Sequence, residues 1–183
     1  RLAEALVSAG YRVILPDLRG VGASSPSRSG YALATYAADM SALLDHLQVK
    51  SCALVGHSMG GQIAQLLSLE ETERVTQQVL LCTVPAAGLP LPEDALGLFQ
   101  SAPGDPEALG TILTMATTSL SDSDKEALVG VAQKISSECL LESLDAWRSG
   151  GFADRLSDVS AQTLVVASDD PFLPPEFLQA AVV

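Results

Sequence analysis

Histidine is nearly absent from this 183-residue chain, which contains only two. Basic residues are also scarce: 10 lysines and arginines stand against 22 aspartates and glutamates, so the formal net charge is -12 at pH 7. A chain this acidic is repelled by phosphate backbones and anionic lipid, which argues against nucleic acids and membrane surfaces as partners. There is no run of 18 apolar residues, so no membrane span is expected.

Cysteine is sparse as well. The three cysteines, Cys52, Cys82 and Cys139, are odd in number and widely spaced, and two of them lie in apolar runs. We therefore expect buried, reduced thiols rather than a disulfide or a metal site, and a reducing, cytoplasmic location. No cluster of histidine, aspartate and glutamate has the spacing of metal ligands, so neither a metal nor an organic cofactor is predicted.

Apolar sequence, in contrast, is plentiful. Hydrophobic residues make up 48% of the chain, enough at this length to bury the core of one domain. Strands are predicted at 12–15, 51–55, 75–82 and 163–167, and helices at 2–9, 33–47 and 62–69. This alternation predicts an α/β fold with a mostly parallel sheet and helices on both faces.

The segment 85–151 does not continue the alternation of predicted strands and helices. Several prolines open it, and the helical patterns that follow are not separated by strands. We therefore expect a helical lid or cap at 85–151, inserted into a partial α/β core made of 1–84 and 152–183.

Capping residues mark helix ends inside this segment. Asp105 followed by Pro106 predicts an N-cap with proline at the first helical position. Ser123 with Glu126 fits a capping box at the start of another helix. A further helix is expected over 135–147.

The motif that carries chemistry is GHSMGG at 56–61, directly after a predicted strand and before a predicted helix. It matches G-x-S-x-G, the pattern of a serine on a sharp strand-to-helix turn with a strained backbone and an accessible hydroxyl. Gly56 and Gly60 are expected to be required, because side chains on either side of Ser58 would clash across the turn. The Met59 N–H, at the helix N-terminus, is expected to donate to an oxyanion.

Together with two other segments, this motif resembles the α/β-hydrolase superfamily, in particular its small lidded, esterase-like members. Residues 17–24, DLRGVGAS, are similar to the loop after the family's fourth strand. Residues 164–174, LVVASDDPFLP, are similar to the strand and loop that carry the acid of the catalytic triad, although Ala167 stands where the family usually has glycine.

The resemblance implies that Asp170 is the triad acid, which orients a histidine and stabilises its charged form. We favour Asp170 over its neighbour Asp169 because Asp170 immediately precedes Pro171. The non-functional interpretation of either residue is a solvated turn aspartate, which is common before proline.

The histidine of the triad is not accounted for. His57 adjoins the serine and is expected to pack beside the site, and His46 has the pattern of a half-exposed residue near a helix end. The resemblance implies a histidine after the acid loop, beyond Val183, and a second oxyanion donor before Arg1. We therefore expect the chain to be a fragment of a longer enzyme, inactive by itself.

The resemblance implies a serine hydrolase that acts on an ester or a related small acyl substrate through Ser58 and an acyl-enzyme. An acyltransferase or perhydrolase using the same nucleophile is one alternative. Another is a non-catalytic small-molecule-binding or scaffold protein of the same fold. A third is a separate chain that supplies the missing ends. The sequence leaves the oligomeric state open.

Overall fold

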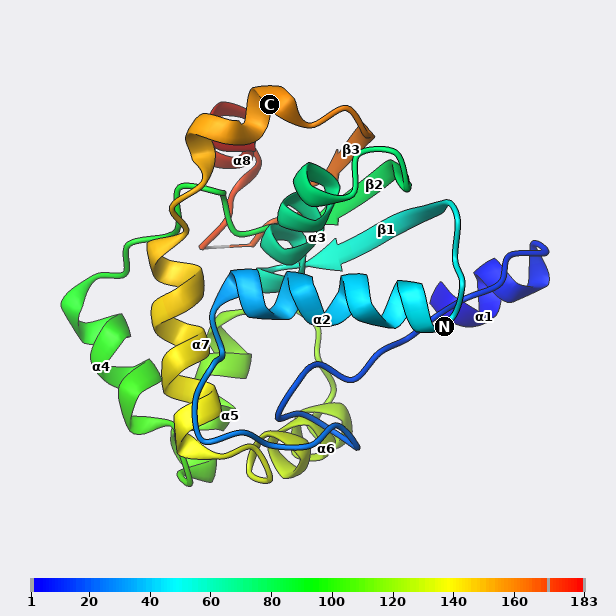
Figure 1. Ribbon diagram of the computed structural model, residues 1–183. Helices are drawn as coiled ribbons and strands as arrows, with labels where there is room; N and C mark the ends of the chain where they lie inside the picture. Colours follow the sequence, from blue (N-terminus) through cyan, green and yellow to red (C-terminus); the bar gives the residue numbers. More distant parts are fainter. Residues whose placement is uncertain (1, 171, 183) are drawn as a thin grey trace.

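The computed structural model describes residues 2–170 and 172–182. Within them, three parallel strands form one sheet in the order β1-β2-β3. The strands are β1 (Cys52–His57), β2 (Val75–Leu81) and β3 (Gln162–Val166). Their arrowheads point toward the helices of the 85–151 segment (Figure 1). The prediction of an α/β fold with a parallel sheet is confirmed.

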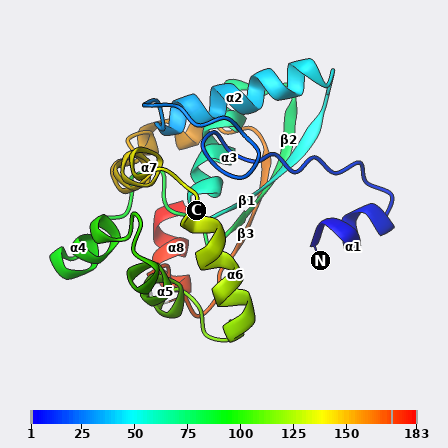
Figure 2. The same ribbon diagram turned by 90° about the horizontal axis from the view of Figure 1, so that it is seen from below.

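Two helices cover one face of this sheet, α2 (Leu33–His46) and α3 (Met59–Glu70) (Figures 1 and 2). α3 joins β1 to β2, as expected for a crossover between parallel strands. The main core cluster lies beneath α2 and includes Tyr31, Tyr36, Ile63, Leu66 and Phe152. Ile63 and Leu66 are one turn apart, so they present the same side of α3 to the core.

The opposite face of the sheet is apolar and open to solvent. Val55, Leu164 and Val166 on this face are 48%, 58% and 41% exposed, and Val55 and Leu164 flank Val79 in register across the strands. Helix α1 (Leu2–Ser8) stands apart from the sheet and has no buried residue (Figure 2). The packed interior of the described chain therefore lies on the α2–α3 side.

The predicted strand at 12–15 was wrong. These residues form no strand in the structure, and Leu15 is 75% exposed. A strand exists only when a neighbour completes its hydrogen-bond ladder, and β1 pairs with β2 rather than with this segment. Ile14 alone packs against the cluster between α2 and β1.

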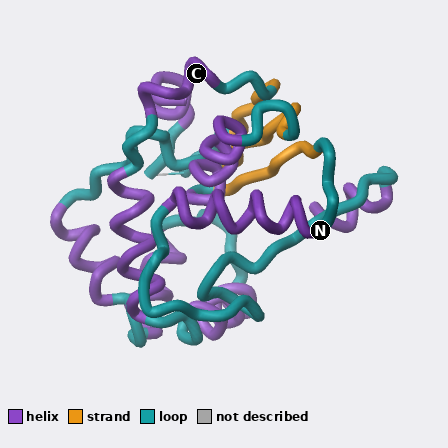
Figure 3. The backbone as a smooth tube through the Cα atoms, viewed as in Figure 1, coloured by secondary structure: helices purple, strands orange, loops and turns teal. Residues whose placement is uncertain are grey.

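The segment between β2 and β3 is built of helices and loops (Figure 3). Its helices are α4 (Glu93–Ser101), α5 (Pro106–Met115), α6 (Asp122–Ala132) and α7 (Ser137–Ser149). A short 3-10 helix, η1 (Ala153–Asp158), leads into β3, and α8 (Pro175–Val182) follows it. The helical character predicted for 85–151 is observed, and its division from the core as a lid stays a prediction.

The helix starts within 85–151 show one correct and one wrong prediction. Asp105 caps α5 as predicted, accepting hydrogen bonds from the N–H groups of Glu107 and Ala108. The cap of α6 is Ser121 rather than Ser123, and it accepts from the Asp124 N–H at 3.1 Å. Helix α6 therefore begins two residues before the expected capping box.

The 85–151 segment has a small core of its own. Ala102, Ala108 and Leu109 are buried together, and Leu98 and Ile112 pack against them. These side chains join α4 to α5, and α5 in turn contacts α6. Helices α4, α5 and α6 thus stabilise one another through their mutual contacts.

Candidate active site

The backbone of Ser58 adopts a conformation that residues with a side chain seldom occupy, with φ 53° and ψ -123°. The residue lies between the end of β1 and the start of α3, which reverses the chain in a single step. Its N–H donates to the Leu81 carbonyl at 3.1 Å, and its carbonyl accepts from Gly61 and Val84 at 2.9 and 3.2 Å. A positive φ at a residue with a side chain is unfavourable and is kept only where the surrounding structure holds it. These hydrogen bonds hold the backbone of Ser58 in this conformation. The predicted strained turn at Ser58 is confirmed.

The glycines around Ser58 differ in whether a side chain would clash at their positions. A Cβ atom at Gly56 would lie 2.3 Å from the Gly60 carbonyl oxygen, so position 56 excludes a side chain as expected. At Gly61 a Cβ atom would lie 2.1 Å from Thr83 Oγ1. The steric argument for Gly60 was wrong, because a Cβ atom placed there would meet no atom within 4 Å apart from the adjacent residues and the backbone of α3 itself. The glycine after Gly60, rather than Gly60 itself, allows α3 to approach the end of β2.

Met59 is the first residue of α3, and its side chain packs against the main core cluster. This packing fixes the first turn of the helix beside Ser58. N–H groups in the first turn of a helix have no intrahelical acceptor. They carry the positive end of the helix dipole, so the Met59 N–H has the chemistry required of an oxyanion donor.

Asp170 follows the carboxyl end of β3, and Ser58 follows the carboxyl end of β1. Because the sheet is parallel, both ends lie on the same side of it. Its Oδ1 atom accepts hydrogen bonds from the N–H groups of Phe172 and Leu173, at 2.8 and 3.2 Å. The carboxylate is half-buried, whereas Asp169 is exposed. Pro171, on which the preference for Asp170 relied, lies outside the described residues. The turn orients Asp170, and the two bonds occupy one of its two oxygens.

The chain just after β2 connects the serine turn to the acid loop. Leu81 and Val84 bond to Ser58, and between them the Cys82 N–H donates to the Val166 carbonyl at 2.8 Å. The Cys82 Sγ atom lies 3.2 Å from Ser168 Oγ. Sequence reasoning treated Cys82 only as a thiol in an apolar run. Cys82 ends a predicted parallel strand, and Ser58 comes shortly after another. This position in the sequence is the signal that would have placed Cys82 at the same end of the sheet as Ser58.

Neither histidine joins this group. His46 ends α2, which leads into the start of β1, whereas Ser58 follows the end of β1. His57 was expected to pack beside the site, and this was wrong: it is exposed and lies on the same face of β1 as Ala53 and Val55. Among the hydrogen bonds of the described residues, none joins either imidazole to Ser58.

All three cysteines are unpaired, as expected. Cys139 is buried, while Cys52 and Cys82 are partly buried. Burial raises the pKa of the Cys139 thiol, and it also raises the pKa of Cys52, so neutral thiols are favoured at these two positions.

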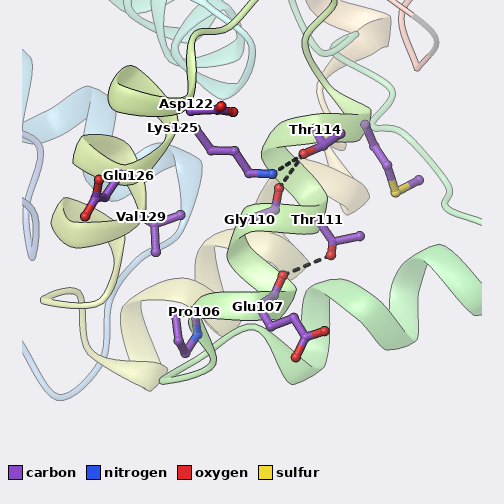
Figure 4. A pocket seen from close by; sticks show the side chains of 10 residues that line it. Pro106, Glu107, Gly110, Thr111, Thr114, Asp122, Lys125, Glu126 and Val129 are labelled. Carbon is purple, nitrogen blue, oxygen red and sulfur yellow. Dashed lines mark hydrogen bonds between the residues drawn. The ribbon is translucent and has the colours of Figure 1, made fainter.

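A hollow of about 540 Å³ lies between α5 and α6 (Figure 4). Lys125 extends across it from α6, and its Nζ atom donates to Thr114 Oγ1 on α5. Glu107 and Glu126 also line the hollow, so its wall carries charge of both signs. The residues that line it all come from α5 and α6.

Within the part of the chain that the structure describes, no three or more His, Cys, Asp and Glu side chains form a group that could hold a metal ion. No described helix combines the length and apolar character needed to cross a bilayer. The reactive groups that follow the three strands are the Ser58 hydroxyl, the Cys82 thiol and the Asp170 carboxylate.

Comparisons with known proteins agree with this arrangement. Residues 1–109 match the family model described as alpha/beta hydrolase fold. A protein of Synechocystis sp., provisionally named a non-heme chloroperoxidase, is 32% identical over 93% of this chain and 68% of its own length. A 2-hydroxy-6-oxononadienedioate/2-hydroxy-6-oxononatrienedioate hydrolase of Paraburkholderia xenovorans is 30% identical over 95% of this chain and 65% of its own. The chain thus spans about two thirds of these relatives.

Solved structures share the same architecture. An esterase from Exiguobacterium antarcticum superposes with a TM-score of 0.88 at 24% identity, covering 97% of this chain and 71% of the esterase. A bromoperoxidase from Bacillus anthracis gives 0.84 at 28% identity, over 95% and 70% of the two chains. The matched family model, the relatives and the strand-turn-helix at Ser58 together show that the chain belongs to the α/β hydrolase fold family.

Proposed function

We propose that the protein containing this chain is a serine hydrolase of ester or related small acyl substrates, with Ser58 as the nucleophile. The observation that carries the proposal is the backbone of Ser58, which has φ 53° at the junction of β1 and α3. Such a turn places a hydroxyl at the end of a parallel sheet with a helix N-terminus beside it. Strain of this kind is typical of active sites.

The remaining roles follow from position. Ser58 would attack the substrate carbonyl and form a tetrahedral oxyanion that receives the Met59 N–H. Collapse to an acyl-enzyme would expel the alcohol, and water would then release the acid. Asp170 would orient the histidine that moves the proton, using the carboxylate oxygen not occupied by the turn.

The histidine itself must come from elsewhere in the protein. A serine hydroxyl is a weak nucleophile without a base. His46 lies at the end of α2, and His57, although it adjoins Ser58 in sequence, is exposed on β1. We therefore expect the 183-residue chain alone to be inactive toward esters.

The names of the relatives support an acyl substrate, but they do not identify which acyl compound it is. Their names include an esterase, a hydrolase of oxononadienedioates and an enzyme that degrades N-acyl homoserine lactones. Non-heme chloroperoxidases and haloperoxidases also occur among them, from Streptomyces lividans and Rhodococcus erythropolis. These names favour a second candidate in which hydrogen peroxide, instead of water, takes the acyl group from Ser58 and leaves as a peracid.

The test uses the full-length natural protein with p-nitrophenyl acetate and p-nitrophenyl butyrate as probes. We expect hydrolysis of the esters and covalent labelling of Ser58 by a fluorophosphonate, located by peptide mass spectrometry. Ser58→Ala should abolish both. Peracid formation from acetate and hydrogen peroxide tests the second candidate on the same samples.

The opposite result has a clear meaning. A folded full-length protein that neither hydrolyses these esters nor reacts at Ser58 contradicts the proposed hydrolase. It would favour the non-catalytic, small-molecule-binding alternative of the same fold.

A further inference from the structure

The lid is attached to the core through two segments that lie side by side, 85–89 and 147–152, here called the lid neck. The Leu89 N–H donates to the Arg148 carbonyl at 3.1 Å, and the Gly151 N–H donates to the Ala86 carbonyl at 2.9 Å. At Gly88, where φ is 89°, a Cβ atom would lie 2.1 Å from the Arg148 carbonyl oxygen. The chain thus enters and leaves the lid through one closely joined pair of segments.

One buried side chain of the nucleophile helix holds both halves of this neck. Gln62 lies one turn after Ser58 on α3 and is fully buried, with 0% of its surface exposed. Its Nε2 atom donates to the Pro85 carbonyl at 2.8 Å and to the Trp147 carbonyl at 3.1 Å. Since four helical residues rise by about 6 Å, the neck is tied to a point close to the serine.

The oxygen of this amide shows that the arrangement has a cost. Gln62 Oε1 is buried, and no described residue donates a hydrogen bond to it. Exchanging the two amide atoms would set Oε1 against two carbonyl oxygens, so the donor contacts fix the orientation. An apolar side chain of similar size would avoid an unpaired buried acceptor, but it could not bind the two neck carbonyls.

The neighbouring amide on the same helix serves as a comparison. Gln65 is also buried, but its Nε2 atom donates to the Gly61 carbonyl and Thr83 Oγ1, at 3.2 and 3.4 Å. These partners belong to α3 itself and to the end of β2. Of the two glutamines, only Gln62 reaches the lid.

Trp147 carries the contact further into the lid. Its ring meets the edge of Phe99 on α4, with 5.7 Å between the ring centroids. It also packs against the cluster of Val84, Leu173 and Leu178, next to the loop that contains Asp170. A shift of the Trp147 backbone would therefore move α4 and α7 relative to the edge of the sheet where Ser58 lies.

We propose that Gln62 is a positioning residue that fixes the lid over Ser58, and that it controls how well the substrate binds rather than how reactive the serine is. The proposal rests on the proposed function for its kinetic consequence. Its structural part, a lid held by the Gln62 amide, stands independently of any activity.

The test compares Gln62→Met with Gln65→Met in the full-length protein. Methionine has a similar size and removes the donor, so the first change frees the neck and the second does not. Because two donor contacts to the neck are lost, we expect Gln62→Met to raise KM for p-nitrophenyl butyrate by at least about fivefold, the value of one typical hydrogen bond, with kcat much less affected. Gln65→Met should leave KM unchanged.

Hydrogen exchange supplies a readout that needs no catalysis. Peptides covering 85–92 and 147–152 should exchange faster in Gln62→Met than in the parent, and should be unchanged in Gln65→Met. Gln62→Asn, a smaller change, keeps the amide but shortens it by one methylene group. It should shift exchange and KM in the same direction, and it replaces Gln62→Met if that variant does not fold.

The outcomes separate the two proposals. Unaltered neck exchange in the folded Gln62 variants, or equal effects of the Gln62 and Gln65 changes, would overturn the role of Gln62. A fall in kcat without a rise in KM would also overturn it. If the parent protein shows no ester hydrolysis while the neck opens only in the Gln62 variants, the hydrolase proposal fails and the lid contact stands.

Discussion

The Val84 N–H donates a hydrogen bond to the carbonyl of Ser58 at 3.2 Å, and this bond links the chain just before the 85–151 segment to the serine turn. A second bond, from the Ser58 N–H to Leu81, anchors the turn to the end of β2. The positive φ of Ser58 is therefore imposed by two backbone bonds to the neighbouring strand and its extension. Strain held in this way has a measurable cost in stability.

We predict that Ser58→Gly is more stable than Ser58→Ala by about 1 kcal/mol. Both variants lose the hydroxyl, but only glycine relieves the backbone at φ 53°, and part of the gain is offset by the greater freedom of unfolded glycine. Urea unfolding of the two full-length variants measures the difference. Equal stabilities would contradict the prediction, because they would mean that the strain at position 58 is no larger than this entropic offset.

A second prediction separates the two glycines of the motif. Gly56→Ala should destabilise the protein by about 3 kcal/mol, because the new methyl group meets backbone atoms of Gly60 that cannot rotate away. Gly60→Ala should leave stability unchanged or raise it by up to about 1 kcal/mol, since alanine favours a helix and its Cβ atom would meet nothing within 4 Å beyond the adjacent residues and the α3 backbone. Urea midpoints of the two variants test this. A large loss in Gly60→Ala would contradict it.

A third prediction concerns the start of α6. Removing the Ser121 hydroxyl should cost about 1 kcal/mol of local stability, whereas removing that of Ser123 should cost little. Because α6 has no buried residue, it can open without the rest of the chain, so hydrogen exchange of its amides is the appropriate measurement. Exchange should be about fivefold faster in Ser121→Ala. Faster exchange in Ser123→Ala would restore the original capping assignment.

Signals that reside within one segment were predictable from the sequence. The strand-turn-helix at Ser58, helix α2 and the Asp105 cap each depend on residues only a few positions apart. The α6 cap shows how such a signal becomes ambiguous. Ser121 and Ser123 are each followed three residues later by an acid, Asp124 and Glu126, and only the backbone path decides between them.

Features that require a distant partner were not predictable. The apolar run at 12–15 has the composition of a strand, but a strand forms only where a neighbour completes its ladder. The sequence predicts that Gln62 lies on a helix. It does not predict the hydrogen bonds of Gln62, because their acceptors, Pro85 and Trp147, are 23 and 85 positions away in sequence. Pairings of this kind follow from the packed fold and leave no periodic pattern in the sequence.

The last prediction decides between Asp170 and Asp169 as the acid. Asn can accept the Phe172 and Leu173 N–H bonds through its own Oδ1, so Asp170→Asn should keep the turn and the stability while losing the charge. In a serine triad this exchange lowers kcat by about 10⁴-fold. Asp170→Ala should in addition lose about 1 kcal/mol, because the turn is no longer capped. Asp169→Asn, at an exposed position, is the matched control and should retain activity. Ester hydrolysis and urea unfolding of the three full-length variants are the measurements, and an active Asp170→Asn beside an inactive Asp169→Asn would transfer the role to Asp169.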